Sequence, residues 1–145
     1  MIFEGVHIFL LFLPGRTFLL YTSFTSMLIQ IVDDSSNMRE TIKSVLGGLS
    51  AEFIESSDGD EAVKQYISCK PDVVIMDIRM KKMDGIAATR AIRSISPNAQ
   101  VVIVTQYDDN DLRATAREAG AVAFVLKDDL SELLRIISQN STKVQ

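Results

Sequence analysis

The stretch VVIMDIRMKKMDG, from Val73 to Gly85, decides the fold. Its four leading apolar residues, Val73–Met76, are typical of a strand that is buried on both faces, as in a parallel sheet covered by helices. The run ends at Asp77, and a carboxylate at the end of a buried strand is costly unless it is exposed, paired or bound to a metal. An Asp-Gly pair, Asp84-Gly85, follows and is typical of a helix start. We therefore expect a strand, a functional loop and a helix in this order.

The chain from Leu28 onward repeats this alternation of a short apolar run and a segment with helical spacing. Strands are predicted at Leu28–Val32, Ala51–Glu55, Val73–Met76, Val101–Val104 and Ala121–Leu126. Helices are predicted to begin after capping residues at Ser35 or Ser36, Asp58, Asp84, Asp108–Asn110, and Asp128 or Asp129. Strands that alternate with helices imply right-handed crossovers and a parallel sheet. The expected fold is α/β, a doubly wound five-stranded parallel sheet with helices on both faces.

Composition limits the class of protein. The 145 residues suit one domain, and an apolar fraction of 47% is ordinary for a globular core. The formal net charge of −4 argues against direct binding of nucleic acid, which usually needs clustered Lys and Arg. Cys69 is the only cysteine, so no internal disulfide can form, and a cytoplasmic setting is expected.

The first 27 residues are strongly apolar and aromatic and form a separate N-terminal extension, residues 1–27, ahead of the domain at 28–145. The apolar run before Pro14–Arg16 is far shorter than the roughly 20 residues that span a bilayer. A basic region and a clear cleavage site, which mark a signal peptide, are missing. Three interpretations stay open: an over-extended gene start with translation from Met27, an appendage that binds a membrane surface or a partner, and an atypical export signal.

Polar side chains follow four of the five predicted strands. Asp33 and Asp34 end the first strand, Asp77 the third, Thr105 the fourth and Lys127 the fifth. Ligands of open parallel α/β sheets bind at the carboxyl ends of the strands, so we expect these side chains to meet at one edge.

These residue types suit phosphoryl transfer. Three neighbouring carboxylates repel one another unless a cation is present, and Mg²⁺ needs only one or two carboxylates plus waters and phosphate oxygens. A lysine can hold an anion, and a threonine hydroxyl can donate to a phosphoryl oxygen. Catalysis of phosphoryl transfer is mostly positioning and charge neutralisation, and a carboxylate can itself be the nucleophile.

The chain resembles the receiver domains of two-component response regulators, and this resemblance implies the flavodoxin-like, CheY-like receiver fold. It covers Leu28 to about Asn140. The motifs that carry it are IVDDS (Ile31–Ser35), VVIMDIRM and MDG (within Val73–Gly85), VVIVT (Val101–Thr105) and AGAVAFVLKD (Ala119–Asp128).

The resemblance implies a metal site. Asp34 matches the main acidic Mg²⁺ ligand, and Asp33 matches the neighbour that often binds through water. Asp77 matches the phosphoacceptor, which also contacts the metal, and Arg79 matches the position that offers its backbone carbonyl. The implied cofactor is Mg²⁺, with Mn²⁺ as a substitute.

The resemblance also implies a switch. Lys127 matches the lysine that pairs with the phosphoryl group on Asp77. Thr105 matches the switch hydroxyl that moves toward that group, and Phe124 matches the switch aromatic that rotates with it. A domain of this kind is a signalling receiver, not an enzyme in the usual sense: it catalyses only its own phosphorylation and slow autodephosphorylation.

The implied partners are proteins. A histidine kinase or phosphotransfer protein would donate the phosphoryl group and dock near Met38, Arg39 and Ile42, and a second copy of the chain is a further expected partner, giving a homodimer. Membrane contact is expected only if the extension at 1–27 is real.

The chain departs from the family pattern at three places. Met80-Lys81 stands where Met-Pro is common, and Arg79 and Tyr107 are large at positions that tune water attack on the phosphoryl group. Bulk there predicts a long-lived phosphorylated form. Asp128 follows Lys127 where proline is common, which resembles the subfamily with a helix-turn-helix output; the chain is then a single-domain regulator or a fragment of a longer one.

Two other functions stay open. A degenerate receiver would bind a partner without turning over phosphate, although the complete set of acids with Thr105 and Lys127 argues against it. A Mg²⁺-dependent phosphohydrolase usually places a second acid two residues after its nucleophile. Arg79 stands there and cannot act as a general acid and base.

Overall fold

The computed structural model describes residues 6–13, 15–23 and 26–141, and its larger part is a five-stranded parallel sheet with the strand order β4-β3-β5-β6-β7. The strands are β3 (Met27–Val32), β4 (Ala51–Ser56), β5 (Val73–Met76), β6 (Val101–Thr105) and β7 (Ala123–Leu126). The helices are α1 (Ser36–Leu46), α2 (Gly59–Cys69), α3 (Gly85–Ile95), α4 (Asn110–Ala119) and α5 (Leu130–Ser141). This is the predicted α/β fold, and the strand order reverses between β3 and β5.

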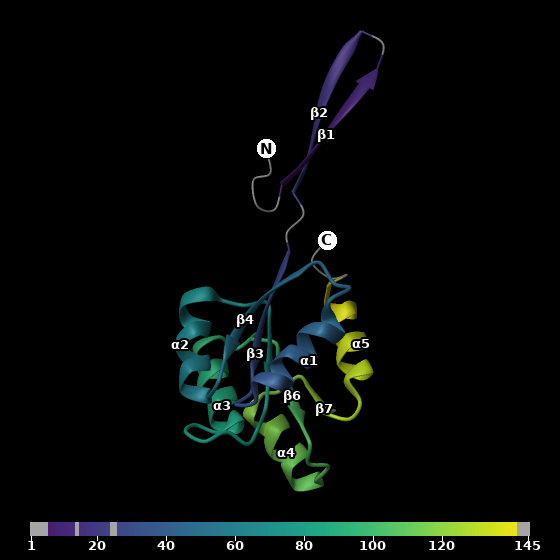
Figure 1. Ribbon diagram of the computed structural model, residues 1–145. Helices are drawn as coiled ribbons and strands as arrows, with labels where there is room; N and C mark the ends of the chain where they lie inside the picture. The colour runs from purple at the N-terminus through teal and green to yellow at the C-terminus, as the bar shows by residue number, and fades with distance from the viewer. Residues whose placement is uncertain (1–5, 14, 24–25, 142–145) are drawn as a thin grey trace.

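Helices cover both faces of the sheet (Figure 1). The four apolar residues of β5 alternate between two separate cores: Val73 and Ile75 pack under α1 and α5, whereas Val74 and Met76 pack under α2, α3 and α4. Side chains of a strand point alternately to opposite faces, so a run that is apolar throughout is what a doubly covered strand requires.

The predicted helix starts are confirmed at four capping residues. The side chains of Ser35, Asp58, Asp84 and Asp109 accept backbone N–H groups at the starts of α1, α2, α3 and α4. These bonds satisfy donors that have no partner within the helix. Gly120 ends α4 in the left-handed conformation, with a φ of 103°.

The predicted start of the last strand at Ala121 is wrong by two residues. The N–H of Ala121 donates to the carbonyl of Ala116 at 3.0 Å, so this residue is part of the turn that caps the end of α4. The strand β7 begins at Ala123.

The N-terminal extension contains an antiparallel hairpin that was not predicted. It consists of β1 (Val6–Leu13) and β2 (Arg16–Ser23), and Gly15 between them has a φ of +88°. β1 is apolar apart from His7, and β2 carries its polar residues in pairs at its two ends, so neither strand shows the alternation by which a half-buried strand is recognised.

None of the described helices is long and apolar enough to cross a membrane.

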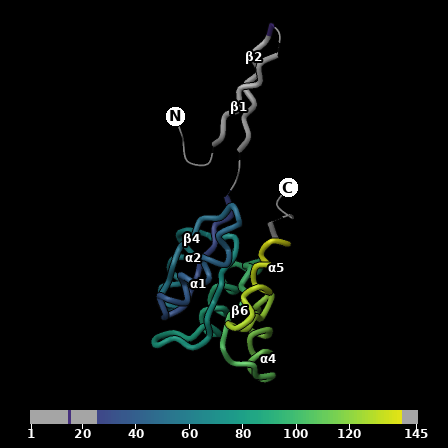
Figure 2. The backbone as a smooth tube through the Cα atoms, turned by 45° about the vertical axis from the view of Figure 1, so that its right-hand side comes forward, coloured from purple at the N-terminus to yellow at the C-terminus, as the bar shows by residue number. Residues whose placement is uncertain are grey.

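The start of β3 and the end of α5 lie at the same end of the sheet domain, in Figure 1 and in the turned view of Figure 2. Because the strands are parallel, their carboxyl ends, with the expected site, lie at the opposite end. The extension therefore joins the domain far from the expected site.

Candidate functional site

Three carboxylates gather at the carboxyl ends of β3 and β5. Asp33, Asp34 and Asp77 each offer a carboxylate oxygen, and these oxygens all lie within 4.8 Å of one another. The parallel register pairs Val32 with Met76, the last residues of the two strands, so the acids that follow are brought side by side. The sequence prediction that these acids meet at one edge is thus met in the structure.

Strand alternation explains why a lysine joins two of these acids. Asp33, Asp77 and Lys127 follow by two positions Ile31, Ile75 and Val125, which all belong to the core under α1 and α5. Residues two apart on a strand share a face, so the three polar side chains emerge on the same side of the sheet. The ammonium of Lys127 lies 2.7 Å from Oδ2 of Asp33 and 3.2 Å from Oδ2 of Asp77.

Asp33 is the most deeply buried of the three acids, with 1% of its surface exposed. Its Oδ1 accepts the N–H of Ser35 at 2.9 Å, and its own N–H donates to the carbonyl of Ser56 at 3.1 Å. Its Oδ2 is buried and pairs with the Lys127 ammonium at 2.7 Å.

Asp77 is also buried and is held by its backbone neighbours. Its Oδ1 accepts the N–H of Ile78 at 2.8 Å, and its own N–H donates to the carbonyl of Val32 at 2.8 Å. Burial raises the pKa of Asp77 above its ordinary value; attraction to Lys127 opposes this, and repulsion from Asp33 adds to it. The ionised form of Asp77 is therefore less stable here than in water and gains from a bound cation.

Lys127 remains charged despite its partial burial. Burial by itself would lower the pKa of Lys127, but the hydrogen bond to Asp33 and the attraction of both carboxylates outweigh it and raise the pKa above the ordinary value. One ammonium faces three carboxylates, so the cluster keeps an excess of negative charge.

The cluster fits a hard divalent cation. Mg²⁺ in proteins is bound by oxygen ligands that include one or two carboxylates, and the three clustered carboxylates together with the raised pKa of Asp77 point to the same need for positive charge. Asp33, Asp34 and Asp77 would hold such an ion.

The large residues Arg79 and Tyr107 lie against each other. The guanidinium carbon of Arg79 is 3.9 Å from the centre of the Tyr107 ring, a cation–π contact. One residue comes from the loop after β5 and the other from the loop after β6, so the contact joins the two loops that follow Asp77 and Thr105. The backbone N–H of Tyr107 donates to the hydroxyl of Thr105 at 3.3 Å.

The two expected switch residues belong to the other side of the sheet. Thr105 is fully buried and continues the alternation of Val101 and Ile103, which pack under α2, α3 and α4. Phe124 is half-buried against the same core, and the guanidinium carbon of Arg113 lies 4.4 Å from its ring centre. Arg113 also pairs with Asp108 of the loop after β6 at 2.8 Å. The sequence reasoning missed Arg113, because nothing local marks a contact between α4 and β7.

Gly85 has a structural role that the sequence reasoning also missed. Its N–H donates to the carbonyl of Ile78 at 2.8 Å and closes the loop after Asp77. A Cβ at this position would overlap the carbonyl oxygen of Asp77 and lie 2.8 Å from its carbonyl carbon. Asp84 is the predicted helix cap, but Gly85 is there because only a residue without a side chain allows this approach.

The loop after Asp77 is also tied to α2. The N–H of Gly59 donates to the carbonyl of Met83 at 3.2 Å, and Lys82 pairs with Asp58 at 3.3 Å. The positive charge expected from Lys81-Lys82 is thus partly balanced by Asp58. Two backbone hydrogen bonds therefore hold the loop that carries Arg79 and Lys81. One joins Gly59 to Met83, and the other joins Gly85 to Ile78.

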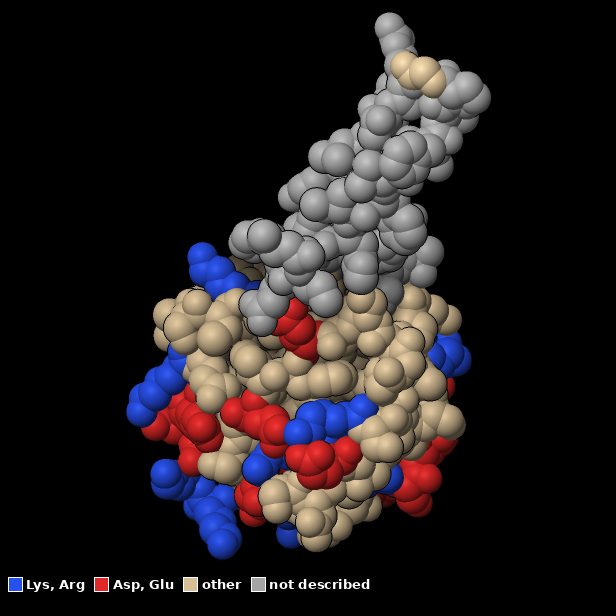
Figure 3. All heavy atoms as spheres, turned by 45° about the horizontal axis from the view of Figure 1, so that its top comes forward, with Lys and Arg blue, Asp and Glu red and all other residues tan. Residues whose placement is uncertain are grey.

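Ile42, which was expected at the docking surface, is buried. Ile42 is 1% exposed and packs in the core under α1 and α5, so its expected role in docking is wrong for this conformation. The helical spacing that identified it marks the buried face of α1. On the face of the domain that Figure 3 shows, basic and acidic side chains are interspersed.

The chain is similar to known proteins both in sequence and in structure. The family model of the response regulator receiver domain matches residues 29–138. Chemotaxis protein CheY of Thermotoga maritima is 37% identical over 100 residues, which cover 68% of this chain and 83% of that protein. The transcriptional regulatory protein YxjL of Bacillus subtilis is 33% identical over 108 residues, which cover 73% of this chain and 50% of that protein. A crystal structure of the CheX-CheY-BeF3-Mg²⁺ complex from Borrelia burgdorferi matches with a TM-score of 0.71 at 30% identity, covering 77% of this chain and 87% of that chain.

Proposed function

The chain belongs to the response regulator receiver family, and on that basis we propose that Asp77 accepts a phosphoryl group from a histidine kinase or phosphotransfer protein in a Mg²⁺-dependent reaction. Acceptance of a phosphoryl group and binding of Mg²⁺ are general properties of this family. Phosphorylation then changes the conformation and controls a partner protein.

One observation carries this proposal. Asp77 is buried, and its carboxylate lies within 4.8 Å of two further carboxylates and 3.2 Å from an ammonium. A divalent cation at Asp33 and Asp34 would neutralise the phosphoryl oxygens during transfer. Lys127 would supply a second positive charge next to Asp77.

In the chemical step, the Asp77 carboxylate itself is the nucleophile. An oxygen of the Asp77 carboxylate attacks phosphorus and forms an acyl phosphate, while the bond from phosphorus to the donor nitrogen or oxygen breaks and its electron pair leaves with the donor. The N–H of Ile78, which donates to Oδ1 of Asp77 at 2.8 Å, holds the carboxylate in one orientation. Lys127 pairs with the phosphoryl group. Thr105 gives up its bond from the Tyr107 N–H and turns its hydroxyl to the new phosphoryl oxygens, and Phe124 follows.

The experiment that tests the function uses a small phosphodonor. Incubation of the whole chain with acetyl phosphate and Mg²⁺ is expected to add the mass of one phosphoryl group, and the adduct is expected to be lost in hydroxylamine, as an acyl phosphate is. Chelation of Mg²⁺ is expected to prevent it. Absence of any adduct would favour a degenerate receiver that only binds its partner.

Replacing both Arg79 and Tyr107 with alanine is expected to shorten the lifetime of the phosphorylated form by about three- to tenfold, because the stacked pair shields the acyl phosphate from water. The lifetime is measured as the decay of the adduct after the phosphodonor is removed. Each single variant is expected to give most of the effect, since either loss breaks the stack. Arg117→Ala, an exposed arginine at the end of α4, is the control. An unchanged lifetime in the double variant would refute the shielding role.

We further propose that residues 28–145 form the complete receiver unit and that residues 1–27 are an appendage to it. A chain that begins at Met27 is expected to have a free energy of unfolding within about 0.5 kcal/mol of that of the full chain, because the described core begins at Met27. Urea denaturation of both chains measures this. A markedly less stable short chain would mean that the extension packs on the domain.

Partners of the proposed receiver are a histidine kinase or phosphotransfer protein in the cytoplasm and a second copy of the chain. Phosphotransfer from purified kinases tests the first. Sedimentation with and without acetyl phosphate tests the second. Membrane contact belongs to the proposal only through residues 1–27.

A further inference from the structure

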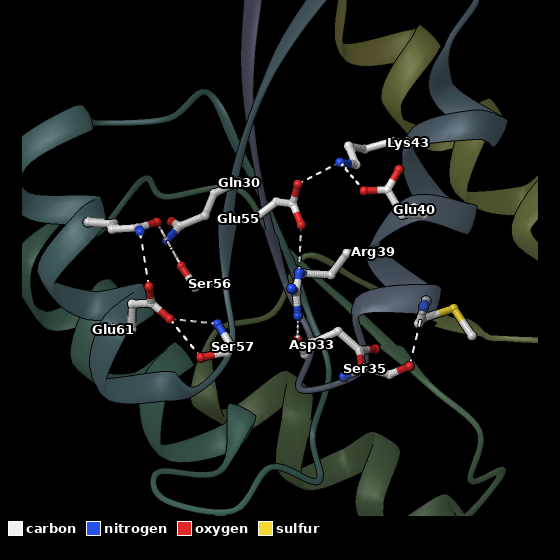
Figure 4. Close-up of polar contacts among 12 residues, drawn as sticks. Gln30, Asp33, Ser35, Arg39, Glu40, Lys43, Glu55, Ser56, Ser57 and Glu61 are labelled. Atoms are coloured by element: carbon white, nitrogen blue, oxygen red, sulfur yellow. Dashed lines mark hydrogen bonds and ion pairs between the residues drawn. The ribbon is translucent and has the colours of Figure 1, made fainter.

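Arg39 links helix α1 to the loop after β3, which carries Asp33 and Asp34, and to strand β4 (Figure 4). Its Nη1 donates to the main-chain carbonyl of Asp33 at 2.7 Å, and its Nε donates to Oε2 of Glu55 at 2.6 Å. The Arg39 side chain is only 16% exposed. A guanidinium that makes two directed hydrogen bonds in a partly buried place is a rigid connection rather than a flexible surface charge.

The carbonyl that Arg39 holds belongs to the peptide unit between Asp33 and Asp34. Asp33 has other anchors, since its N–H and its Oδ1 are both hydrogen-bonded. Asp34 is exposed, and the residues that the structure describes give its side chain no hydrogen bond or ion pair. The position of the Asp34 carboxylate therefore depends on its backbone, which Arg39 fixes from the preceding peptide.

Glu55 neutralises the positive charge of Arg39, which would otherwise repel a cation bound at the three clustered aspartates. One carboxylate oxygen of Glu55 pairs with Arg39 and the other with Lys43 at 2.5 Å, while Lys43 also pairs with Glu40 at 2.6 Å (Figure 4). Hydrogen bonds from Lys43 and Arg39 hold the pKa of Glu55 below its ordinary value. The group of four residues thus contains two positive and two negative charges and is neutral as a unit.

We propose that Arg39 is a positioning residue of the metal site: it holds the Asp33–Asp34 peptide so that the Asp34 carboxylate faces the cation, and Glu55 orients Arg39 and balances its charge. This inference rests on the proposed function, because it requires a divalent cation at Asp34. Residues that orient metal ligands without touching the metal commonly change metal affinity by about 10- to 100-fold when they are replaced.

The test measures Mg²⁺ binding to the whole chain by isothermal titration calorimetry, with no phosphodonor present. Arg39→Met keeps much of the side-chain stem but removes both hydrogen bonds, and it is expected to weaken Mg²⁺ binding about tenfold. Lys43→Met is the matched control. It removes a charge from the same Glu55 without touching Asp33, so its affinity is expected to stay within about twofold of wild type.

A second readout separates positioning from a general defect. The Mg²⁺ concentration that gives half-maximal phosphorylation by acetyl phosphate is expected to rise in Arg39→Met by the same factor as the dissociation constant of Mg²⁺, and an unchanged concentration would refute the positioning role. Acetyl phosphate also makes the rate independent of kinase docking near α1. Glu55→Gln keeps an acceptor for Arg39 but not the charge, and a smaller loss of affinity, about threefold, is expected.

The outcomes distinguish the two levels of the proposal. If wild type binds no Mg²⁺, the proposed function itself fails. If wild type binds Mg²⁺ and Arg39→Met binds it equally well, only the positioning role is overturned, and equal weakening in Lys43→Met would overturn it as well. Should Arg39→Met not fold, Arg39→Lys replaces it. A lysine cannot reach the Asp33 carbonyl and Glu55 with the same fork, so a loss of at least about threefold is expected, and wild-type affinity would refute the proposal.

Discussion

Asp77→Asn is expected to abolish the phosphoryl adduct completely and, in a buffer without divalent cations at neutral pH, to make the protein more stable. The first effect follows because an amide is not a nucleophile toward phosphorus. The second follows from the raised pKa of Asp77. The native state binds a proton at this carboxyl more tightly than the unfolded state does, so the contribution of Asp77 to stability is fully present below its unfolded pKa and is lost as the pH rises through the folded value.

At pH 7 the charged and buried Asp77 is therefore a net cost. Asparagine removes the charge and keeps an oxygen for the N–H of Ile78, so the free energy of unfolding is expected to rise by roughly 1 to 2 kcal/mol. The difference from wild type is expected to shrink as the pH falls toward 4, because wild-type Asp77 then takes up its proton.

Mg²⁺ is expected to reverse the order of stability. A ligand at 100 times its dissociation constant stabilises the native state by about 2.7 kcal/mol, and the variant has lost one of the carboxylates that attract it. Urea denaturation with EDTA and with Mg²⁺ measures both effects. Asp109→Asn, which preserves the cap of α4, is the control for removal of a carboxylate elsewhere. A variant that is less stable than wild type in EDTA would contradict the account of Asp77.

Gly85→Ala is expected to lower the free energy of unfolding by about 3 kcal/mol or more. The added methyl group would overlap the carbonyl of Asp77, and this neighbour is backbone that directly follows β5. Relief requires the loop to open at the bond between the Gly85 N–H and the Ile78 carbonyl, or α3 to move away.

Gly48→Ala is the matched control for this variant. Its Cβ would meet no atom within 4 Å, and Gly48 is not among the residues with positive φ. Its stability is expected to change by less than about 1 kcal/mol, with a gain rather than a loss from reduced freedom of the unfolded chain. If both glycines tolerated alanine equally, the close approach at Gly85 would be refuted. Any folded Gly85→Ala protein is expected to bind Mg²⁺ more weakly, because Asp77 is displaced.

Features that depend on local patterns could be predicted from the sequence. The strands of the sheet follow from short apolar runs, and the helix starts follow from capping residues such as Ser35 and Asp84. The meeting of Asp33, Asp77 and Lys127 follows from the rule that strand ends share an edge. Alternation along the strands, counted from Ile31 and Ile75, would also have predicted which side of the sheet they occupy.

Features that depend on contacts between distant segments could not be predicted in this way. The ion pair of Arg39 with Glu55 joins a helix to a strand, and no regular sequence spacing relates these two residues. The sequence identifies Gly85 only as part of a helix start. The requirement for glycine at this position comes from its close approach to the backbone of Asp77 across a loop. The hairpin of β1 and β2 was missed for a different reason: its strands carry no alternation of apolar and polar residues.

The alternation within β6 has a consequence for which changes in chain length the domain can accept. Thr105 faces α2, α3 and α4, whereas Asp77 and Lys127 emerge on the side of α1 and α5. Whether a residue has an odd or an even position in its strand therefore decides whether it lies on the side of the expected phosphoacceptor Asp77 or on the side of the expected switch residue Thr105. Insertion of one residue within β6 would exchange these sides for the residues of β6 that follow it, Thr105 included. Insertions in the connecting loops leave the assignment intact. If the chain works as the proposed receiver, the coupling of phosphorylation at Asp77 to a partner depends on keeping Asp77 and Thr105 on opposite sides of the sheet, and hence on the parity of strand lengths.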